Sequence, residues 1–230
     1  LKNPDPGWNP HSTSSAHSIA AITVSFGCMT KANRSNASNA MVYSFVPVHM
    51  LPHNSPHKYD AFFQPLIEEI EELFINGEEV YFASSSSESE YPTLRAIPLF
   101  VTADSKAHSE IGLTNAGGYR GCRRCFLGGT YVPEKRHYYY GHFRYRYRYP
   151  VESRTAVSNR QYGVQVDTAT SDAERKRLSK ESGVTGECIF YRLYDLCGFN
   201  PLLDLTIDAM HTIVLNMIKT ELEAHLLADL

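Results

Sequence analysis

The chain has 230 residues, of which 43% are hydrophobic and 20% are charged. This length fits one domain, with or without an insertion, and the apolar content excludes a wholly disordered chain. No apolar run approaches the roughly 18 residues that a bilayer span needs, and no N-terminal segment resembles a secretory signal. We therefore expect a protein that is not secreted and has no membrane partner. Residue 1 is Leu, which is compatible with a segment of a longer protein.

Positive charge is concentrated in one part of the chain. The formal net charge is −3, but residues 120–160 hold ten basic and two acidic side chains, and the segments on both sides are acidic. We call residues 120–160 the basic island. Such an asymmetry indicates a polyanionic partner more strongly than the total charge does.

Hydrophobic periodicity predicts the order strand, strand, helix, strand, insertion, helix. In the predicted helix, apolar residues recur on one face and glutamates occupy the other. A continuous apolar run later in the chain predicts a buried strand that ends on a carboxylate. In chain order, the elements are strands over 18–26 and 40–48, a helix over 60–75, a strand over 96–104, a loop over 115–129, a short helix within 167–187 and a long helix over 206–227.

Three aspartates, Asp5, Asp104 and Asp208, are candidates for a metal-dependent site. Two-metal phosphoryl transfer needs carboxylates from separate elements to converge on Mg²⁺ ions, which prefer oxygen ligands. Asp104 is the strongest candidate, because a charge at the end of an apolar strand is costly unless something uses it. Alternatively, Asp104 only caps the following segment, since Asp favours helix starts.

Cys122 and Cys125 have the spacing of half a tetrahedral zinc site. Five cysteines with one close pair do not fit a secreted disulfide framework, and the Gly- and Arg-rich flanks do not fit a thioredoxin-like redox motif. His211 is our first choice for a third ligand, and on a helix it would share a face with Asp208. The remaining candidates are His137, His142 and His225.

The run Phe143–Tyr149 alternates three arginines with three tyrosines. In a strand, the arginines would lie on one face, where they can neutralise phosphates, and the tyrosines on the other, where they can stack on bases. Alternatively, the run is a surface β-ribbon whose tyrosine face covers a small core. The predicted nucleic-acid-binding residues are Arg120, Arg123, Arg124, Arg144, Arg146 and Arg148. The same charge is increased by Lys135, Arg136, Arg154 and Arg160.

Four stretches together resemble a known family. They are Asp5-Pro-Gly-Trp-Asn-Pro10 with His17 and Ser18 downstream, the helix Phe62–Leu73, the run Leu94–Asp104 with the later Gly121 and Cys122–Cys125, and Ile207-Asp-Ala-Met-His211. Their order and spacing across nearly the whole chain resemble the central domain of En/Spm-type (CACTA) transposases, the transposase family tnp2.

The resemblance implies an α/β fold with a ribonuclease-H-like core, which this chain would hold in incomplete form, and a zinc-bearing basic insertion. Residues 1–119 and 191–230 would form the core, and residues 120–190 the insertion. Enzymes of this group cut and join DNA at transposon ends with Mg²⁺. The resemblance therefore implies phosphoryl transfer, DNA as the partner and a nuclear location, and it allows a homo-oligomer.

The resemblance also assigns roles to residues. The metal-binding acids would be Asp5, Asp104 and Asp208, and a structural zinc would be held by Cys122, Cys125 and His211. Asp208 could instead support the histidine, in which case the third acid is Glu221, Glu223 or a residue beyond 230.

Several positions depart from the family pattern. Pro6 is inserted between Asp5 and the Trp-Asn-Pro sequence, and Ser-Lys-Ala follows Asp104. Two further functions therefore stay open beside a DNA transposase. One is a non-catalytic, zinc-stabilised nucleic-acid-binding module derived from such an enzyme, and the other is an inert transposase fragment.

Overall fold

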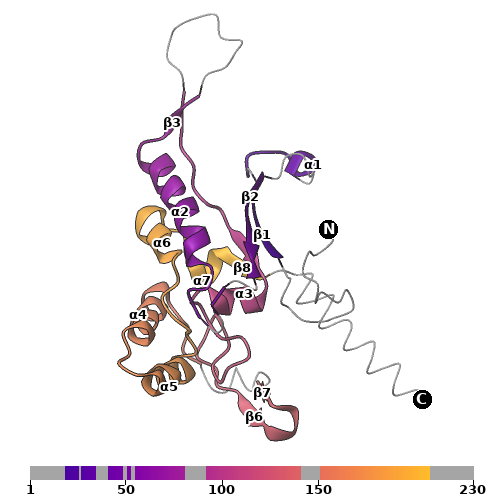
Figure 1. Cartoon of the computed structure of the whole chain (residues 1–230), viewed down its shortest axis with the longest axis vertical. Coiled ribbons are helices and arrows are strands. Elements are labelled where there is room, and N and C mark those ends of the chain that lie inside the picture. Colours follow the sequence, from indigo (N-terminus) through magenta and orange to yellow (C-terminus); the bar gives the residue numbers. More distant parts are fainter. Residues whose placement is uncertain are drawn as a thin grey trace, which may run out of the picture. The chain divides into compact units, whose positions relative to one another are not determined.

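The computed structural model describes residues 19–25, 27–34, 41–48, 51–52, 55–80, 92–140 and 151–207 (Figure 1). Within these ranges the chain is a mixed α/β protein whose strands form four two-stranded sheets. The chain divides into two compact units, Leu1–His53 and Asn54–Leu230. No helix among the described residues is long and apolar enough to cross a membrane.

The first unit contains an antiparallel strand pair. β1 (Ile19–Val24) pairs with β2 (Met41–Pro47), with Ile19 opposite Pro47 and Val24 opposite Met41. Both strands are rich in β-branched and aromatic residues, which suit a pleated surface, and both confirm the strands predicted from the sequence. The segment between them contains a short helix, α1 (Lys31–Arg34), that the sequence did not predict.

In the second unit, α2 (Asp60–Ile75) forms over the range that its periodicity predicts, with Ile67 fully buried. Arg95 donates to the carbonyl oxygens of Phe74 and Ile75 at 2.7 and 2.6 Å, so a cation satisfies the last carbonyls of the helix. The glutamate face of α2 is not wholly exposed to solvent. Arg192, in a later helix, donates from Nε and Nη2 to the carboxylate of Glu71.

Two strand pairs follow α2. β3 (Glu78–Glu79) pairs with β4 (Thr93–Leu94) in antiparallel fashion. β5 (Val101–Ala103) pairs in parallel with β8 (Leu205–Ile207), about one hundred residues later in the chain. Only the last part of the strand predicted over 96–104 is therefore a strand. The residue after it, Asp104, begins α3 (Ser105–Glu110).

The helix predicted from Thr206 is wrong at its first two residues. Leu205, Thr206 and Ile207 form β8 instead, because two of the three are β-branched, Leu205 is fully buried, and β5 supplies a hydrogen-bonding partner. Sequence periodicity could not reveal that distant partner. The rest of the predicted helix, residues 208–227, lies outside the described residues.

The middle of the chain contains a hairpin followed by helices. β6 (Thr130–Val132) and β7 (His137–Tyr139) are joined by a 3-10 turn, η4 (Pro133–Lys135). Next come α4 (Ala156–Asp167) and α5 (Asp172–Ser182), which lie side by side in Figure 1. The last helices are α6 (Tyr191–Cys197) and α7 (Pro201–Asp204). Periodicity missed α4 because part of its buried face is polar or small, as at Asn159 and Gly163.

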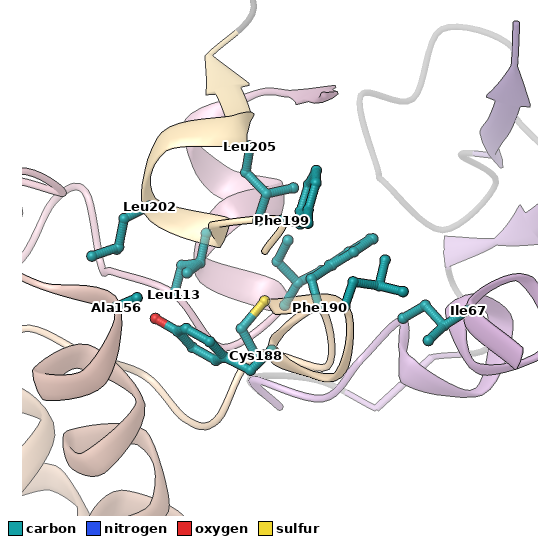
Figure 2. Packing of buried hydrophobic residues seen from close by; sticks show 11 residues of the cluster. Ile67, Leu113, Ala156, Cys188, Phe190, Phe199, Leu202 and Leu205 are labelled. Atoms are coloured by element: carbon teal, nitrogen blue, oxygen red, sulfur yellow. The ribbon is translucent and has the colours of Figure 1, made fainter. Parts of the chain in front are cut away.

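One hydrophobic cluster joins α2, α4, α6, α7 and β8 of the second unit. Figure 2 shows Phe190 and Cys188 at its centre, with Ile67 of α2 on one side and Phe199 and Leu205 near it. The rings of Phe190 and Phe199 lie 6.0 Å apart. Because Leu205 belongs to this cluster, the same apolar burial that holds α2 also fixes β8 beside β5.

His57, just before α2, links two carboxylates that are far apart in the sequence. His57 lies 2.8 Å (Nδ1) from Oδ2 of Asp60 and 2.9 Å (Nε2) from Oδ1 of Asp167, the last residue of α4. The hydrogen bond to Asp167, followed by that to Asp60, raises the pKa of His57 from 6.5 to about 10. The imidazolium is thus the form that the folded chain stabilises.

This pair of contacts predicts a pH dependence of stability. The pKa of His57 is higher in the folded chain than in the unfolded one, so its contribution is fully present below about pH 6.5 and is lost as the pH rises towards about 10. The difference in unfolding free energy between the wild type and His57→Gln should be largest near pH 6 and should shrink by pH 10. Urea titrations at several pH values measure it, and a difference independent of pH would contradict the charged pairing.

Candidate functional site

Asp104 lies where β5 ends and α3 begins, with its side chain half-buried. Its Oδ1 accepts a hydrogen bond of 2.6 Å from the backbone N–H of Ala107, so Asp104 is the N-cap of α3. The capping role that the sequence left open is therefore present in the fold. This bond uses one of two carboxylate oxygens, and a carboxylate has about four acceptor positions, so capping and metal binding are compatible.

The parallel register of β5 and β8 sets the position of the chain on either side of this aspartate. Thr102 lies opposite Thr206, with 2.9 Å between their hydroxyl oxygens, and Ala103 lies opposite Ile207. Both strands therefore end at the same edge of their sheet. Asp104 follows Ala103 directly, and the next residue in the sequence after Ile207 is Asp208. Asp208 itself, Asp5 and His211 lie outside the described residues.

The half-buried Arg123 and the buried His108 adjoin this edge. Arg123 donates through Nη1 to the carbonyl oxygen of Leu205, and the same nitrogen lies 3.4 Å from Nδ1 of His108 on α3. Burial, followed by the charge of Arg123, lowers the pKa of His108 to about 4, so this imidazole is neutral at neutral pH. Burial also lowers the pKa of Arg123. Sequence reasoning missed His108, although it lies four residues after Asp104.

The second candidate centre is the cysteine pair. The Sγ atoms of Cys122 and Cys125 lie 3.3 Å apart, and neither cysteine forms a disulfide. Two thiolates on one tetrahedral zinc ion would lie roughly 3.8 Å apart, given a Zn–S distance of about 2.3 Å. The observed separation is shorter than this, so the two sulfur atoms would have to move apart to share a zinc ion. No group of three or more His, Cys, Asp or Glu that could hold a metal occurs in the described part of the chain, so the structure does not bring His137 to these thiols.

The cysteine loop is held by one buried arginine. Arg154 is only 7% exposed. Its Nε donates to the carbonyl oxygens of Cys122 at 2.9 Å and Cys125 at 3.2 Å, and its Nη2 donates to those of Arg120 at 3.1 Å and Ser182 at 2.6 Å. One guanidinium thus joins both cysteines to the end of α5. Such a planar five-donor group suits several fixed carbonyls at once.

The residues around Arg154 leave little room for substitution. Its guanidinium carbon lies 4.2 Å from the ring centroid of Phe126, where a cation is favoured over the aromatic face. Gly183 has a φ of +79°, and a Cβ there would lie 2.1 Å from the carbonyl oxygen of Arg120. Burial lowers the pKa of Arg154 to about 10, which leaves it charged at neutral pH.

Fewer basic side chains of the basic island are available to a partner than the sequence predicts. Arg154 is buried, and Arg160 is paired at 2.8 Å with Glu187 and at 2.5 Å with Asp195. Neither side chain is therefore available to bind phosphate, although the sequence analysis included both in the positive charge of the island. Arg124 is exposed, and Arg120 lies near the rings of Tyr119 and Phe126. The remaining predicted arginines, Arg144, Arg146 and Arg148, lie outside the described residues.

Comparison with known proteins gives one family. A family model described as "Transposase family tnp2" matches residues 4–181, more than half of the chain. That range includes the end of β5, the cysteine pair and Arg154. No curated protein matches, and neither does any solved structure.

The contacts of Arg154 predict a large effect of a conservative change. Arg154→Lys keeps the charge but cannot reach carbonyls on several sides, so the unfolding free energy should fall by at least about 2 kcal/mol. The thiols of Cys122 and Cys125 should also react faster with a thiol-specific dye. The matched control is Arg124→Lys, an exposed neighbour, which should change stability by less than about 0.5 kcal/mol. Equal behaviour of both variants would contradict the anchoring role.

Proposed function

The chain belongs to the transposase family tnp2, and from this we propose that it is a transposon-derived DNA-binding protein of CACTA (En/Spm) type. The proposed activity is Mg²⁺-dependent cleavage and strand transfer of DNA at transposon ends. The proposed core is ribonuclease-H-like, with residues 120–190 as its insertion. A DNA partner would place the protein in the nucleus.

The parallel pairing of β5 and β8 carries the catalytic part of the proposal. Ala103 and Ile207 are opposite each other in register, and an aspartate follows each of them in the sequence. Carboxylates that follow adjacent parallel strands leave the same edge of a sheet, where ligands of open α/β sheets bind. Ala103 and Ile207, the residues that precede Asp104 and Asp208 in the sequence, are therefore one strand spacing apart.

The chain's own groups at this edge fit a cation. Asp104 is held by the N–H of Ala107, which fixes its orientation before any ligand binds. His108 is neutral and buried, so it adds no competing positive charge beside Asp104. Mg²⁺ held by Asp104, Asp208 and, by family resemblance, Asp5 would neutralise the charge of a reacting phosphate and favour attack by water or a DNA hydroxyl.

A structural zinc is the second part of the proposal. Cys122 and Cys125 would supply two sulfur ligands, whose Sγ atoms, 3.3 Å apart, would separate further on binding the ion. His211 is the proposed third ligand, and His142 or His225 the fourth. The carbonyls of both cysteines are already bound by Arg154, so the loop is shaped before the ion binds. The ion would add a second connection between the basic insertion and the core.

DNA is the proposed partner because the chain between Tyr140 and Val151 contains Arg144, Arg146 and Arg148 and is anchored on both sides. Tyr140 binds the loop before the cysteines: its hydroxyl donates to the carbonyl of Gly118 and accepts from the N–H of Gly121. After the run, the N–H of Phe126 donates to the carbonyl of Glu152 at 3.0 Å. The described residues on either side of the run, Tyr140 and Glu152, therefore both contact the loop that contains the cysteine pair.

The capping geometry gives a sharp test of catalysis. Asp104→Asn keeps an N-cap side chain, since Asn caps helices about as well as Asp, but it removes the carboxylate charge. We expect Mg²⁺-dependent cleavage of a plasmid carrying the transposon ends to fall at least about 100-fold, because the metal loses a ligand. DNA affinity and thermal stability should stay within error of the wild type.

The control separates chemistry from folding. Asp104→Ala loses both the charge and the cap, so it should abolish cleavage and also cost about 1 kcal/mol of stability. Undiminished cleavage by Asp104→Asn would show that Asp104 is only a cap. A wild type that binds DNA without cleaving it would favour the non-catalytic binding module instead.

The zinc site is tested by metal content. Wild-type protein dialysed against metal-free buffer should retain about one zinc per chain by atomic emission, and Cys122→Ser should lose it and become less stable. Cys28→Ser is the matched control, because Cys28 is exposed and belongs to the other compact unit. Zinc contents that are equal in the two variants, or zero in the wild type, would exclude this site.

A further inference from the structure

The hairpin β6–β7 presents two cations of the basic island that the fold leaves exposed. Lys135 and Arg136, at its tip, are exposed, and they make no ion pair among the described residues. By contrast, Arg123, Arg154 and Arg160 are bound to groups of the chain itself. Within the described part of the basic island, the positive charge available to a polyanion is therefore reduced at Arg123, Arg154 and Arg160 and retained on this hairpin and at Arg124.

The hairpin also exposes aromatic rings on both of its faces. Thr130 lies opposite Tyr139, and Tyr131 lies opposite Tyr138, so the two pairs occupy opposite faces of the ribbon. Tyr131 is 48% exposed and Tyr139 is 47% exposed. Large rings that reach so far into solvent beside unpaired cations are typical of a surface that binds a partner.

Contacts with the cysteine loop hold the hairpin at its base. The ring of Tyr138 lies 6.0 Å from that of Tyr119, and the hydroxyl of Tyr140 binds the backbone of Gly118 and Gly121. A Cβ on Gly121 would lie 2.5 Å from that hydroxyl, so a side chain there would push the hairpin away. The base is therefore fixed to the loop that contains Cys122, while the tip projects from it (Figure 1).

We infer that the hairpin Thr130–Tyr139 is a DNA-binding ribbon that places its tip in the major groove of duplex DNA. The inference rests on the proposed DNA-binding function and names the contacting element. A two-stranded antiparallel ribbon fits the major groove of B-form DNA, whereas the major groove of an RNA duplex is too narrow for side chains to read. Lys135 and Arg136 contact phosphates on the groove walls, and Tyr131 and Tyr139 contact sugars or base edges.

The ring geometry favours duplex over single-stranded DNA. The rings of His137 and Tyr139 meet at 84°, with centroids 5.3 Å apart. Those of Tyr131 and Tyr138 meet at 54°. Binding of single strands relies on aromatic rings on which successive bases stack. Neither the edge-to-face pair of His137 and Tyr139 nor the tilted pair of Tyr131 and Tyr138 offers parallel rings for such a platform.

The test removes the two tip charges without disturbing the turn. Arg136 has a φ of +50°, a left-handed conformation that Asn adopts more easily than most residues, so the double variant is Lys135→Gln with Arg136→Asn. In the full chain, affinity for a duplex of about 30 base pairs should fall at least about tenfold near 0.1 M salt. The slope of log affinity against log salt should become shallower by about 1.8, since each phosphate contact contributes about 0.9.

The control removes the same charge elsewhere. Lys176→Gln with Lys180→Gln takes two exposed lysines from α5, and its affinity and slope should stay close to those of the wild type. Glu134→Gln, at the hairpin tip, should bind the duplex about twofold to threefold more tightly, because it removes a repulsive charge. A gain of affinity cannot come from misfolding.

Each outcome decides the inference. An unchanged affinity and slope in the tip variant, or an equal loss in the α5 control, would overturn it. Tighter binding of wild-type protein to single-stranded DNA or to RNA than to duplex DNA would also overturn it. If the tip variant binds normally while Asp104→Asn stops cleavage, only the hairpin is wrong; if the tip variant loses binding while Asp104→Asn cleaves normally, only the catalytic proposal is wrong.

Discussion

The rest of the structure depends on the parallel pairing of β5 with β8 across about one hundred residues of chain. Neither strand is long, and three residues of each make the pair. Their alignment is maintained by burial of Leu205 in the hydrophobic cluster and by the bond from Arg123 to the carbonyl of Leu205. Burial of Leu205 has no preferred direction, whereas the hydrogen bond from Arg123 fixes the position of the Leu205 carbonyl. Together they set where the chain leaves the sheet after Ala103 and after Ile207.

Arg154 connects the loop of Cys122 and Cys125 to the end of α5. An arginine without a carboxylate partner is expensive to bury, and here several backbone carbonyls share its charge instead. The result is a cysteine loop and a helix end that are joined through one side chain. The island that looks like a uniform basic surface in the sequence therefore has two parts, one that builds the fold and one that faces outwards. The hairpin Thr130–Tyr139 belongs to the outward part.

The sequence predicted the elements that have a strong local signal. The period of α2, the apolar and β-branched composition of β1, the alternation of β2 and the carboxylate after the apolar run all agree with the structure. It could not predict β8, because that strand depends on a partner far away in the chain. It also missed α4, which buries Asn159 rather than an apolar residue at that position. Burial of Arg154 and His108 leaves no signal in a sequence read alone.

The central claim is that the ends of β5 and β8 hold one divalent cation, and Fe²⁺ can test it by cutting the chain where it binds. Fe²⁺ added in place of Mg²⁺, with ascorbate and peroxide, generates radicals that cleave nearby backbone, and mass spectrometry locates the cuts. The proposed site predicts cuts next to Asp104 and next to Ile207 together, both suppressed by excess Mg²⁺. Cuts at only one of the two positions, or at neither, would contradict a shared cation site.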